Sequence, residues 1–237
     1  MKHLLRISFM FLFGLVIITG CSKDEDDDNN KPPEVVSPEI QSKLDEINVP
    51  ENLANSQTWY ALQVSAYVAQ IKSINSYFAY FDPVEGAEYD DGVYFWTNGG
   101  QSVWLNYTET SNTYGWEMDV DFGNGRVDYI SAEQQKDGSS GWLRVYDYTE
   151  STTGNFIYEY NWEILGDDSV VLSWSNSEDG FNLEIKGSPD DSGYAKYFEN
   201  NVPVYEFVWN SDGSGYYTTY DDTGELENTT NWTTDNL

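Results

Sequence analysis

The chain has a single cysteine and a single histidine in 237 residues, which leaves few of the side chains that common catalytic centres use. A Ser–His–Asp triad, a Cys–His pair and a zinc site of His and Cys ligands each require more of them. The sequence also lacks a glycine-rich phosphate loop before a helix and a dinucleotide-binding fingerprint. These absences predict a protein that is not an enzyme and that carries no cofactor.

Basic residues are scarce as well. Lysine and arginine together number 11 against 41 aspartates and glutamates, so the formal net charge is −30. Such a chain is unsuited to nucleic acid, whose binding depends on lysine and arginine contacts to phosphate, and anionic lipid surfaces do not attract it. Aromatic residues, by contrast, make up 16 % of the chain, with nine Trp and nineteen Tyr, which predicts a substantial buried core.

The N-terminus has the features of a secretory signal peptide. Residues 1–20 begin with positive charge and continue into an apolar run, Ile7–Ile18, that is shorter than the roughly 20 residues of a membrane-spanning helix. The small residues Thr19 and Gly20 precede Cys21, and this arrangement resembles the lipobox of bacterial lipoproteins. The resemblance implies cleavage before Cys21 and attachment of acyl chains to its thiol, which would anchor the protein to a membrane.

An acidic segment follows the cysteine. Lys23 precedes five consecutive acidic residues, 24–28, and this stretch resembles the export signal of Bacteroidota surface lipoproteins. The resemblance implies a lipid anchor in the outer membrane with the folded part exposed at the cell surface, and an orientation toward the periplasm is the alternative. Residues 21–38 are therefore expected to form the lipidated cysteine and a charged, proline-bearing tether.

Residues 39–82 have the residue spacing of helices. A short helix is expected over 38–47 and a longer one over 52–81, and the longer helix should end before Pro83, which disfavours the α conformation in the preceding residue. Its apolar residues recur three, four and seven positions apart, which predicts one buried stripe. The stripe consists of Trp59, Val64, Tyr67, Val68, Ile71, Ile74, Phe78 and Phe81.

Residues 83–237 change to a period of two. Apolar and polar residues alternate in 114–122, 156–164 and 181–186, and turns rich in Gly, Asn and Asp separate such segments. We count about twelve strands without a crossover helix between them. The predicted fold is therefore mainly β: an antiparallel meander, as a sheet or an open barrel, with the helical segment packed on it.

A weak repeat marks the C-terminal half. Each copy has a glycine and an aromatic residue after a turn and a tryptophan further along the chain: Gly141-Trp142 with Trp162, Gly193-Tyr194 with Trp209, and Gly215-Tyr216 with Trp232. Residues 212–224 resemble the MORN-type hairpin repeats of bacterial surface proteins. The resemblance favours a repetitive meander and carries little functional information.

Aromatic residues are the strongest candidates for ligand binding. Trp and Tyr on a sheet face can stack on sugar rings, because they combine apolar area with a polar group. Surface lipoproteins of Bacteroidota often capture glycans, so the resemblance implies a glycan, or another extracellular macromolecule, as the ligand. The candidate binding residues, which lie near turns and beside polar residues, are Trp142, Tyr146, Tyr194, Tyr216 and Tyr220.

Two acidic residues are minor candidates for other chemistry. Asp119 and Asp121 share the polar side of one predicted strand, where same-face residues lie about 6.8 Å apart. They could hold Ca²⁺ through carboxylate oxygens or act as a carboxylate pair in glycoside hydrolysis. A solvated strand face is the simpler interpretation of the same pattern.

Ser169 is a candidate for modification. Asp168-Ser169-Val170 matches a short acceptor pattern for O-glycosylation in Bacteroidota. Because three residues match often by chance, this remains a minor hypothesis.

The sequence as a whole favours a lipid-anchored binding protein of the cell envelope, with a glycan or another extracellular macromolecule as its partner. One alternative is an envelope lipoprotein that contacts another protein through a sheet edge or through the repeat surface. A carboxylate-pair glycoside hydrolase is the least favoured alternative.

Overall fold

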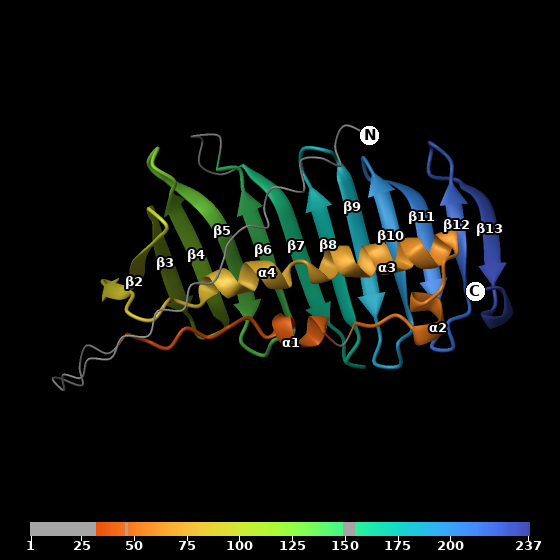
Figure 1. The fold of residues 1–237 in the computed structure, drawn as a ribbon, viewed down its shortest axis with the longest axis horizontal. Helices are drawn as coiled ribbons and strands as arrows, with labels where there is room; N and C mark the ends of the chain where they lie inside the picture. Colours follow the sequence, from red (N-terminus) through yellow and green to blue (C-terminus); the bar gives the residue numbers. More distant parts are fainter. Residues whose placement is uncertain (1–31, 46, 149–154) are drawn as a thin grey trace. The chain divides into compact units, whose positions relative to one another are not determined.

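One antiparallel sheet of thirteen strands dominates the computed structural model, which describes residues 32–45, 47–148 and 155–237. The strands follow one another across the sheet in their chain order, so each pairs only with its sequence neighbours (Figure 1). β1 and β13 are the two ends of this open sheet. The predicted antiparallel meander is therefore confirmed, as an open sheet.

The strands are β1 Glu88–Asp90, β2 Val93–Asn98, β3 Gln101–Glu109, β4 Thr113–Asp121, β5 Arg126–Gln135, β6 Ser140–Tyr146, β7 Phe156–Ile164, β8 Val170–Asn176, β9 Phe181–Gly187, β10 Gly193–Glu199, β11 Val202–Trp209, β12 Gly215–Tyr220 and β13 Leu226–Trp232. Twelve of them begin at Val93 or later, in agreement with the alternating pattern. The additional strand, β1, has three residues and is too short to show an alternation.

Four turns at one end of the sheet share a hydrogen-bonding scheme. They connect β5 to β6, β7 to β8, β9 to β10 and β11 to β12, and successive turns of this set are two strands apart. In each, an Asp carboxylate accepts a hydrogen bond from the N–H of the Ser two residues later, at 2.9–3.1 Å: Asp137, Asp167, Asp190 and Asp212. Side-chain and backbone hydrogen bonds from these serines lower the pKa of the four carboxyl groups.

The helical segments are α1 Ile40–Leu44, α2 Glu51–Ala54, α3 Trp59–Lys72, α4 Asn75–Phe78, η2 Ala79–Phe81 and η3 Thr234–Asn236. The prediction of one unbroken helix over 52–81 is wrong at its start. Ser56 Oγ accepts a hydrogen bond from the N–H of Thr58 at 3.1 Å, and Thr58 has an extended backbone with ψ 150°. The chain therefore leaves the helical conformation after α2 and enters it again at Trp59.

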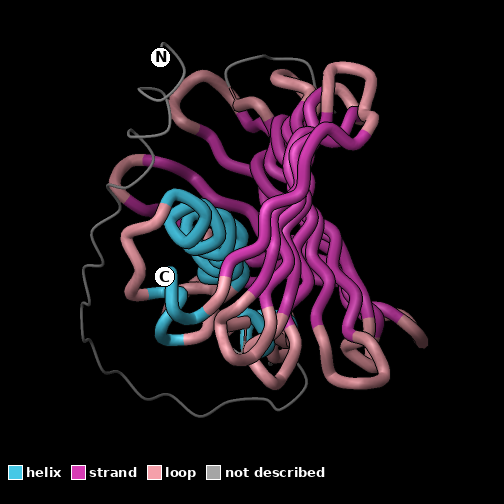
Figure 2. Tube along the Cα trace, turned by 90° about the vertical axis from the view of Figure 1, so that its right-hand side faces the viewer, coloured by secondary structure: helices cyan, strands magenta, loops and turns pink. Residues whose placement is uncertain are grey.

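α3, α4 and η2 lie across one face of the sheet (Figures 1 and 2), which we call the covered face. Most of the predicted stripe is buried there: Val64, Val68, Ile71, Ile74, Phe78 and Phe81. Trp59 differs, because it is 46 % exposed and packs its ring against Tyr205, Phe207 and Tyr217 at the margin of the core. The helix and the inner side chains of the strands thus share one hydrophobic core.

The repeated glycine and tryptophan positions form a recurring contact on this covered face. Gly141, Gly193 and Gly215 lie directly opposite Trp162, Trp209 and Trp232 of the following strand. A Cβ atom at Gly215 would lie only 2.5 Å from Cζ2 of Trp232, so the indole can lie across the strand only where glycine stands. The indole N–H of Trp232 donates to the carbonyl of Gly213 at 2.8 Å. The repeat is therefore a packing motif.

None of the helices in the described ranges has both the length and the apolar character that crossing a membrane requires.

Candidate functional site

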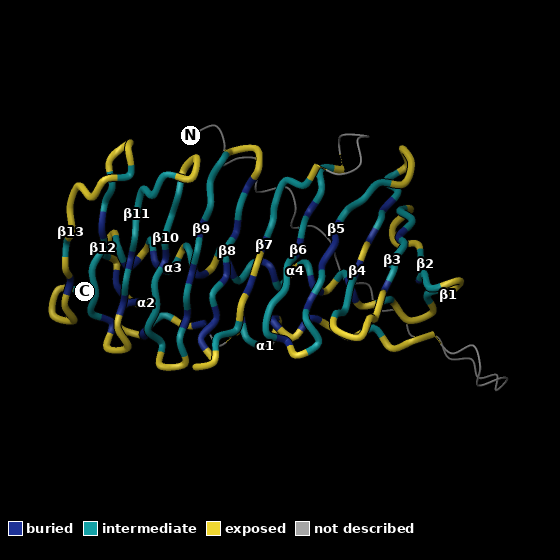
Figure 3. Tube along the Cα trace, turned by 180° about the vertical axis from the view of Figure 1, so that it is seen from behind, coloured by how far each residue is buried: buried dark blue, intermediate teal, exposed yellow. Residues whose placement is uncertain are grey.

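The second face of the sheet carries no helix within the described part of the chain, and we call it the uncovered face (Figures 2 and 3). Along most strands its side chains alternate with the buried ones, although Ser131 of β5 and Thr218 of β12 are buried on this face too. The register places one continuous row of them across nine strands, β5 to β13: Glu133, Trp142, Asn161, Ser173, Glu184, Lys196, Glu206, Thr218 and Thr229. Most members of this row are polar, so this face can stay in contact with water without a cover.

All five predicted aromatic residues lie on the uncovered face. Trp142 and Tyr194, for example, alternate with the buried residues Leu143 and Ala195 of their own strands. They do not form one cluster, however, because they occupy three separate strands: Trp142 and Tyr146 on β6, Tyr194 on β10, and Tyr216 and Tyr220 on β12. The sequence therefore does not predict which of them share a site.

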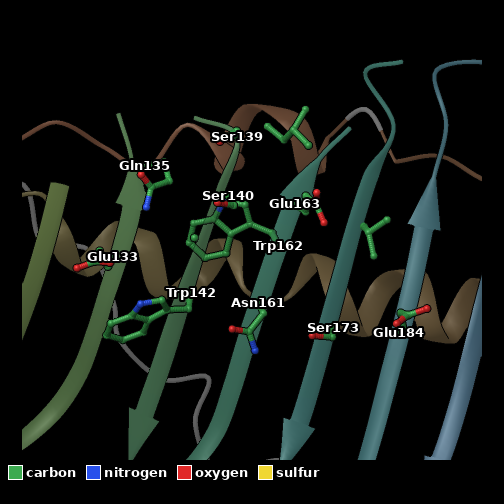
Figure 4. A pocket seen from close by; sticks show the side chains of 13 residues that line it. Glu133, Gln135, Ser139, Ser140, Trp142, Asn161, Trp162, Glu163, Ser173 and Glu184 are labelled. Carbon is green, nitrogen blue, oxygen red and sulfur yellow. The ribbon is translucent and has the colours of Figure 1, made fainter. Parts of the chain in front are cut away.

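Trp142 borders a hollow of about 520 Å³ over strands β5 to β9 (Figure 4). Small and amide side chains, including Asn161 and Ser173, line its middle, and Ser139 and Ser140 lie at one end. The volume is within the range of about 300–1,000 Å³ that small-molecule sites occupy. An aromatic ring beside a polar floor can offer both stacking and hydrogen bonds to a ligand.

Arg144 fixes Trp142 from one side. Its guanidinium Cζ lies 4.7 Å from the ring centroid of Trp142 and 5.0 Å from that of Phe156, and its Nε donates to Glu159 Oε2 at 2.6 Å. Arg144 does not line the hollow, whereas Ser140, two residues before Trp142, does. The hollow therefore lies on the side of Trp142 away from Arg144, and the arginine holds the ring in place.

Three carboxylates border the hollow: Glu133, Glu163 and Glu184. Glu184 Oε1 accepts a hydrogen bond from the hydroxyl of Tyr194 at 2.9 Å. Burial and this bond raise the pKa of Tyr194, so its hydroxyl stays protonated as a donor. Within the described residues, the carboxylates of Glu133 and Glu163 take part in no side-chain hydrogen bond or ion pair, so both can accept bonds from a ligand.

The other predicted tyrosines lie outside the hollow. The hydroxyls of Tyr146 and Ser131 are 2.8 Å apart, on the far side of Arg144. Tyr220 donates to Glu206 Oε2 at 3.1 Å, and its pKa is raised by burial and by that carboxylate. Tyr216 lies on β12, opposite Val208 in the register. These three residues are not part of the site at Trp142.

Asp119 and Asp121 are both occupied by contacts within the protein. Arg126 Nε donates to Asp119 Oδ2 at 2.7 Å, and Asp121 Oδ1 accepts the N–H groups of Gly123 and Gly125 in the following turn. Within the described residues, no three Asp, Glu, His or Cys side chains are grouped so that they could hold a metal ion. The two carboxylates thus stabilise the hairpin of β4 and β5.

Sequence reasoning missed Asp128, which lies opposite Asp119 in the register of β4 and β5. Burial, followed by the charge of Asp119, raises the pKa of the Asp128 carboxyl. A bulge between Met118 and Asp119 brings the two carboxylates opposite one another, and alternation within a single strand carries no sign of it.

Of the two predicted modification sites, Ser169 lies within the described residues and Cys21 does not. Ser169 is fully buried, and its hydroxyl donates to Ser188 Oγ at 3.2 Å, so a sugar could be attached only if the turn before β8 opened. Cys21 and the acidic segment after it lie outside the described residues.

The polar residues of the hollow were also not predicted. Asn161, Ser173 and Glu184 stand on three different strands, and only the register brings them to Trp142. The one available signal was their position in the alternation, which places each on the polar side of its strand.

Comparison of the chain with protein-family models gives no match, and comparison with curated proteins gives no significant match.

Proposed function

We propose that this chain is a non-enzymatic binding module of the cell envelope, anchored through a lipid on Cys21, whose uncovered sheet face takes up a glycan. The observation that carries the proposal is Trp142 beside the hollow of about 520 Å³. One side of its ring is stacked on Arg144, and the other side borders a floor of Asn and Ser side chains with the carboxylates of Glu133 and Glu163 beside it.

This arrangement supports binding rather than turnover. Sugar rings offer apolar C–H faces for stacking and hydroxyl groups that donate to carboxylates and amide oxygens. A rigid ring loses little conformational entropy when a ligand stacks on it, and the contacts of Arg144 supply that rigidity. The lipobox-like sequence and the acidic segment after Cys21 support an outer-membrane anchor with the sheet exposed at the cell surface.

A glycan array with purified full-length protein tests the proposal. We expect binding to neutral glycans that Trp142→Ala reduces by about tenfold or more, because stacking contributes about 1 kcal/mol beyond the buried area. Trp104→Ala is the matched control, since Trp104 also lies on the uncovered face beneath an arginine and does not line the hollow. Absence of binding to every glycan, or equal losses in both variants, would contradict the proposal.

A further inference from the structure

Tyr194 repeats, four strands away, the construction found at Trp142. Lys196 Nζ lies 4.8 Å from the ring centroid of Tyr194, much as Arg144 Cζ lies 4.7 Å from that of Trp142. Each cation stands two residues after its aromatic ring and is paired with a glutamate of the following strand. Because β6 and β10 run in the same direction in the meander, each cation covers its ring from the same side.

The hollow reaches the carboxylate that holds Tyr194, although Tyr194 itself does not line it. It extends from Trp142 over Asn161 and Ser173 to Glu184, the carboxylate that accepts the hydroxyl of Tyr194 at 2.9 Å. Neighbouring strands lie about 4.8 Å apart, so the four intervals from β6 to β10 span about 19 Å. We call the line from Trp142 across the hollow to Tyr194 the trough; Trp142 borders the hollow, and Tyr194 stands on β10, one strand beyond Glu184.

The charges of this face select against anions. Within the described residues, four cationic side chains lie on this face and each pairs with a carboxylate, at 2.5–3.8 Å: Arg126, Arg144, Lys186 and Lys196. The hollow itself is bordered by three glutamates and by no cation. A uronate or a sulfated sugar would therefore meet repulsion that no free arginine or lysine among the described residues of this face offsets.

We propose that Trp142 and Tyr194 are two aromatic subsites of one trough, and that the trough takes a neutral, linear oligosaccharide lying across strands β6 to β10. This inference rests on the proposed function and names its ligand class. A single sugar contacts one ring only, whereas an oligomer long enough to span the trough contacts both rings and the polar floor between them.

Isothermal titration calorimetry of the full-length protein tests this with β-1,4-linked gluco-, manno- and xylo-oligosaccharides, each from disaccharide to hexasaccharide. Affinity should rise with chain length until both rings are reached and then level off. Tyr194→Ala should weaken binding of the long oligomers by about tenfold and leave the disaccharides unchanged, whereas Trp142→Ala should weaken binding at every length. Oligogalacturonides, as the anionic series, should bind more weakly than the neutral series.

Tyr146→Ala is the control variant, because Tyr146 lies on the uncovered face on the far side of Arg144 and should not affect binding. Binding that is independent of chain length, or unchanged by Tyr194→Ala, would overturn the two-subsite trough and leave the proposed function standing. Tighter binding of oligogalacturonides would overturn the neutral ligand class. Absence of binding in every series would overturn both the trough and the proposed function.

Discussion

The two faces of the sheet use aromatic residues in different ways. On the covered face, rings contact rings, as Phe81 does with Trp116 at a centroid distance of 5.7 Å. On the uncovered face, rings contact cations, as Trp104 does with Arg126 at 4.8 Å, although Phe95 also lies beside Trp104. A ring surrounded by apolar neighbours contributes to stability, whereas a ring held from one side by a cation keeps its other side available.

The alternation along a strand decides on which face each residue lies. Tyr160 and Trp162 of β7 are almost fully buried under the helix, while Glu159 and Asn161, which alternate with them, face the solvent. Substitutions on the covered face should therefore change mainly the free energy of unfolding, and substitutions at the hollow on the uncovered face should change mainly binding.

The largest expected effect comes from truncating matched tryptophans on the two faces. Trp209→Ala should lower the free energy of unfolding by about 3–5 kcal/mol, because Trp209 is 1 % exposed and its indole N–H donates to the carbonyl of Asp191 at 2.9 Å. Trp104→Ala should cost about 1 kcal/mol, since its main partner is the guanidinium of Arg126. Urea denaturation followed by circular dichroism measures both, and equal losses would contradict the division between the faces.

A smaller effect is expected from adding one methyl group at matched glycines. A Cβ at Gly215 would lie 2.1 Å from the carbonyl oxygen of Val208 and 2.5 Å from the ring of Trp232, so Gly215→Ala should lower stability by about 1–3 kcal/mol. A Cβ at Gly115, on the uncovered face, would meet only Thr108 Oγ1 closely, at 2.6 Å, and that side chain can rotate away. Gly115→Ala should therefore be close to neutral in thermal unfolding. Similar melting temperatures for the two variants would argue against the indole packing as the reason for glycine.

The smallest expected effect is on the pH dependence of stability. It comes from the four Asp–Ser turns at one end of the sheet, which belong to neither face. Hydrogen bonds lower the pKa of four turn carboxyls below their ordinary value of about 3.9. A lowered pKa means that these groups stabilise the fold above that value and lose this contribution as the pH falls through the folded-state pKa. We therefore expect stability to decrease on the acid side of about pH 4.

Replacing the four carboxyls by amides isolates this contribution: Asp137→Asn, Asp167→Asn, Asp190→Asn and Asp212→Asn in one variant. Asparagine keeps an oxygen that can accept the serine N–H and has no proton to gain, so the acid loss of stability should become shallower. Urea unfolding at a series of pH values measures the slopes. Parallel slopes in the parent and the variant would show that the turn carboxylates do not set the acid limit.

Much of the fold follows from residue spacing. The period of two identifies the strands and the side to which each residue belongs, as with buried Leu143 beside half-exposed Trp142. The helix stripe from Val64 to Phe81 is equally visible in the sequence. The helix break at Ser56 is not visible in the sequence, because it depends on one local side-chain hydrogen bond that competes with the helix.

The site was less predictable than the fold, for a physical reason. Alternation places Trp142 and Tyr194 on the polar side of their strands, but their separation depends on how many strands lie between them and on the register of each pair. Register is fixed by turn geometry and by core packing together, and bulges such as that between Val145 and Tyr146 change it locally. The separation of Trp142 and Tyr194 therefore cannot be read from the sequence alone.

The strictly sequential pairing of the strands also has a consequence for how such a sheet can change in length. Each hairpin contacts mainly its immediate neighbours in the chain, so loop closure costs little and folding can proceed hairpin by hairpin. Duplication or deletion of one hairpin would extend or shorten the array by two strands, about 9.6 Å, without altering the order of the others. Evolution can thus adjust the reach of such a surface in fixed increments.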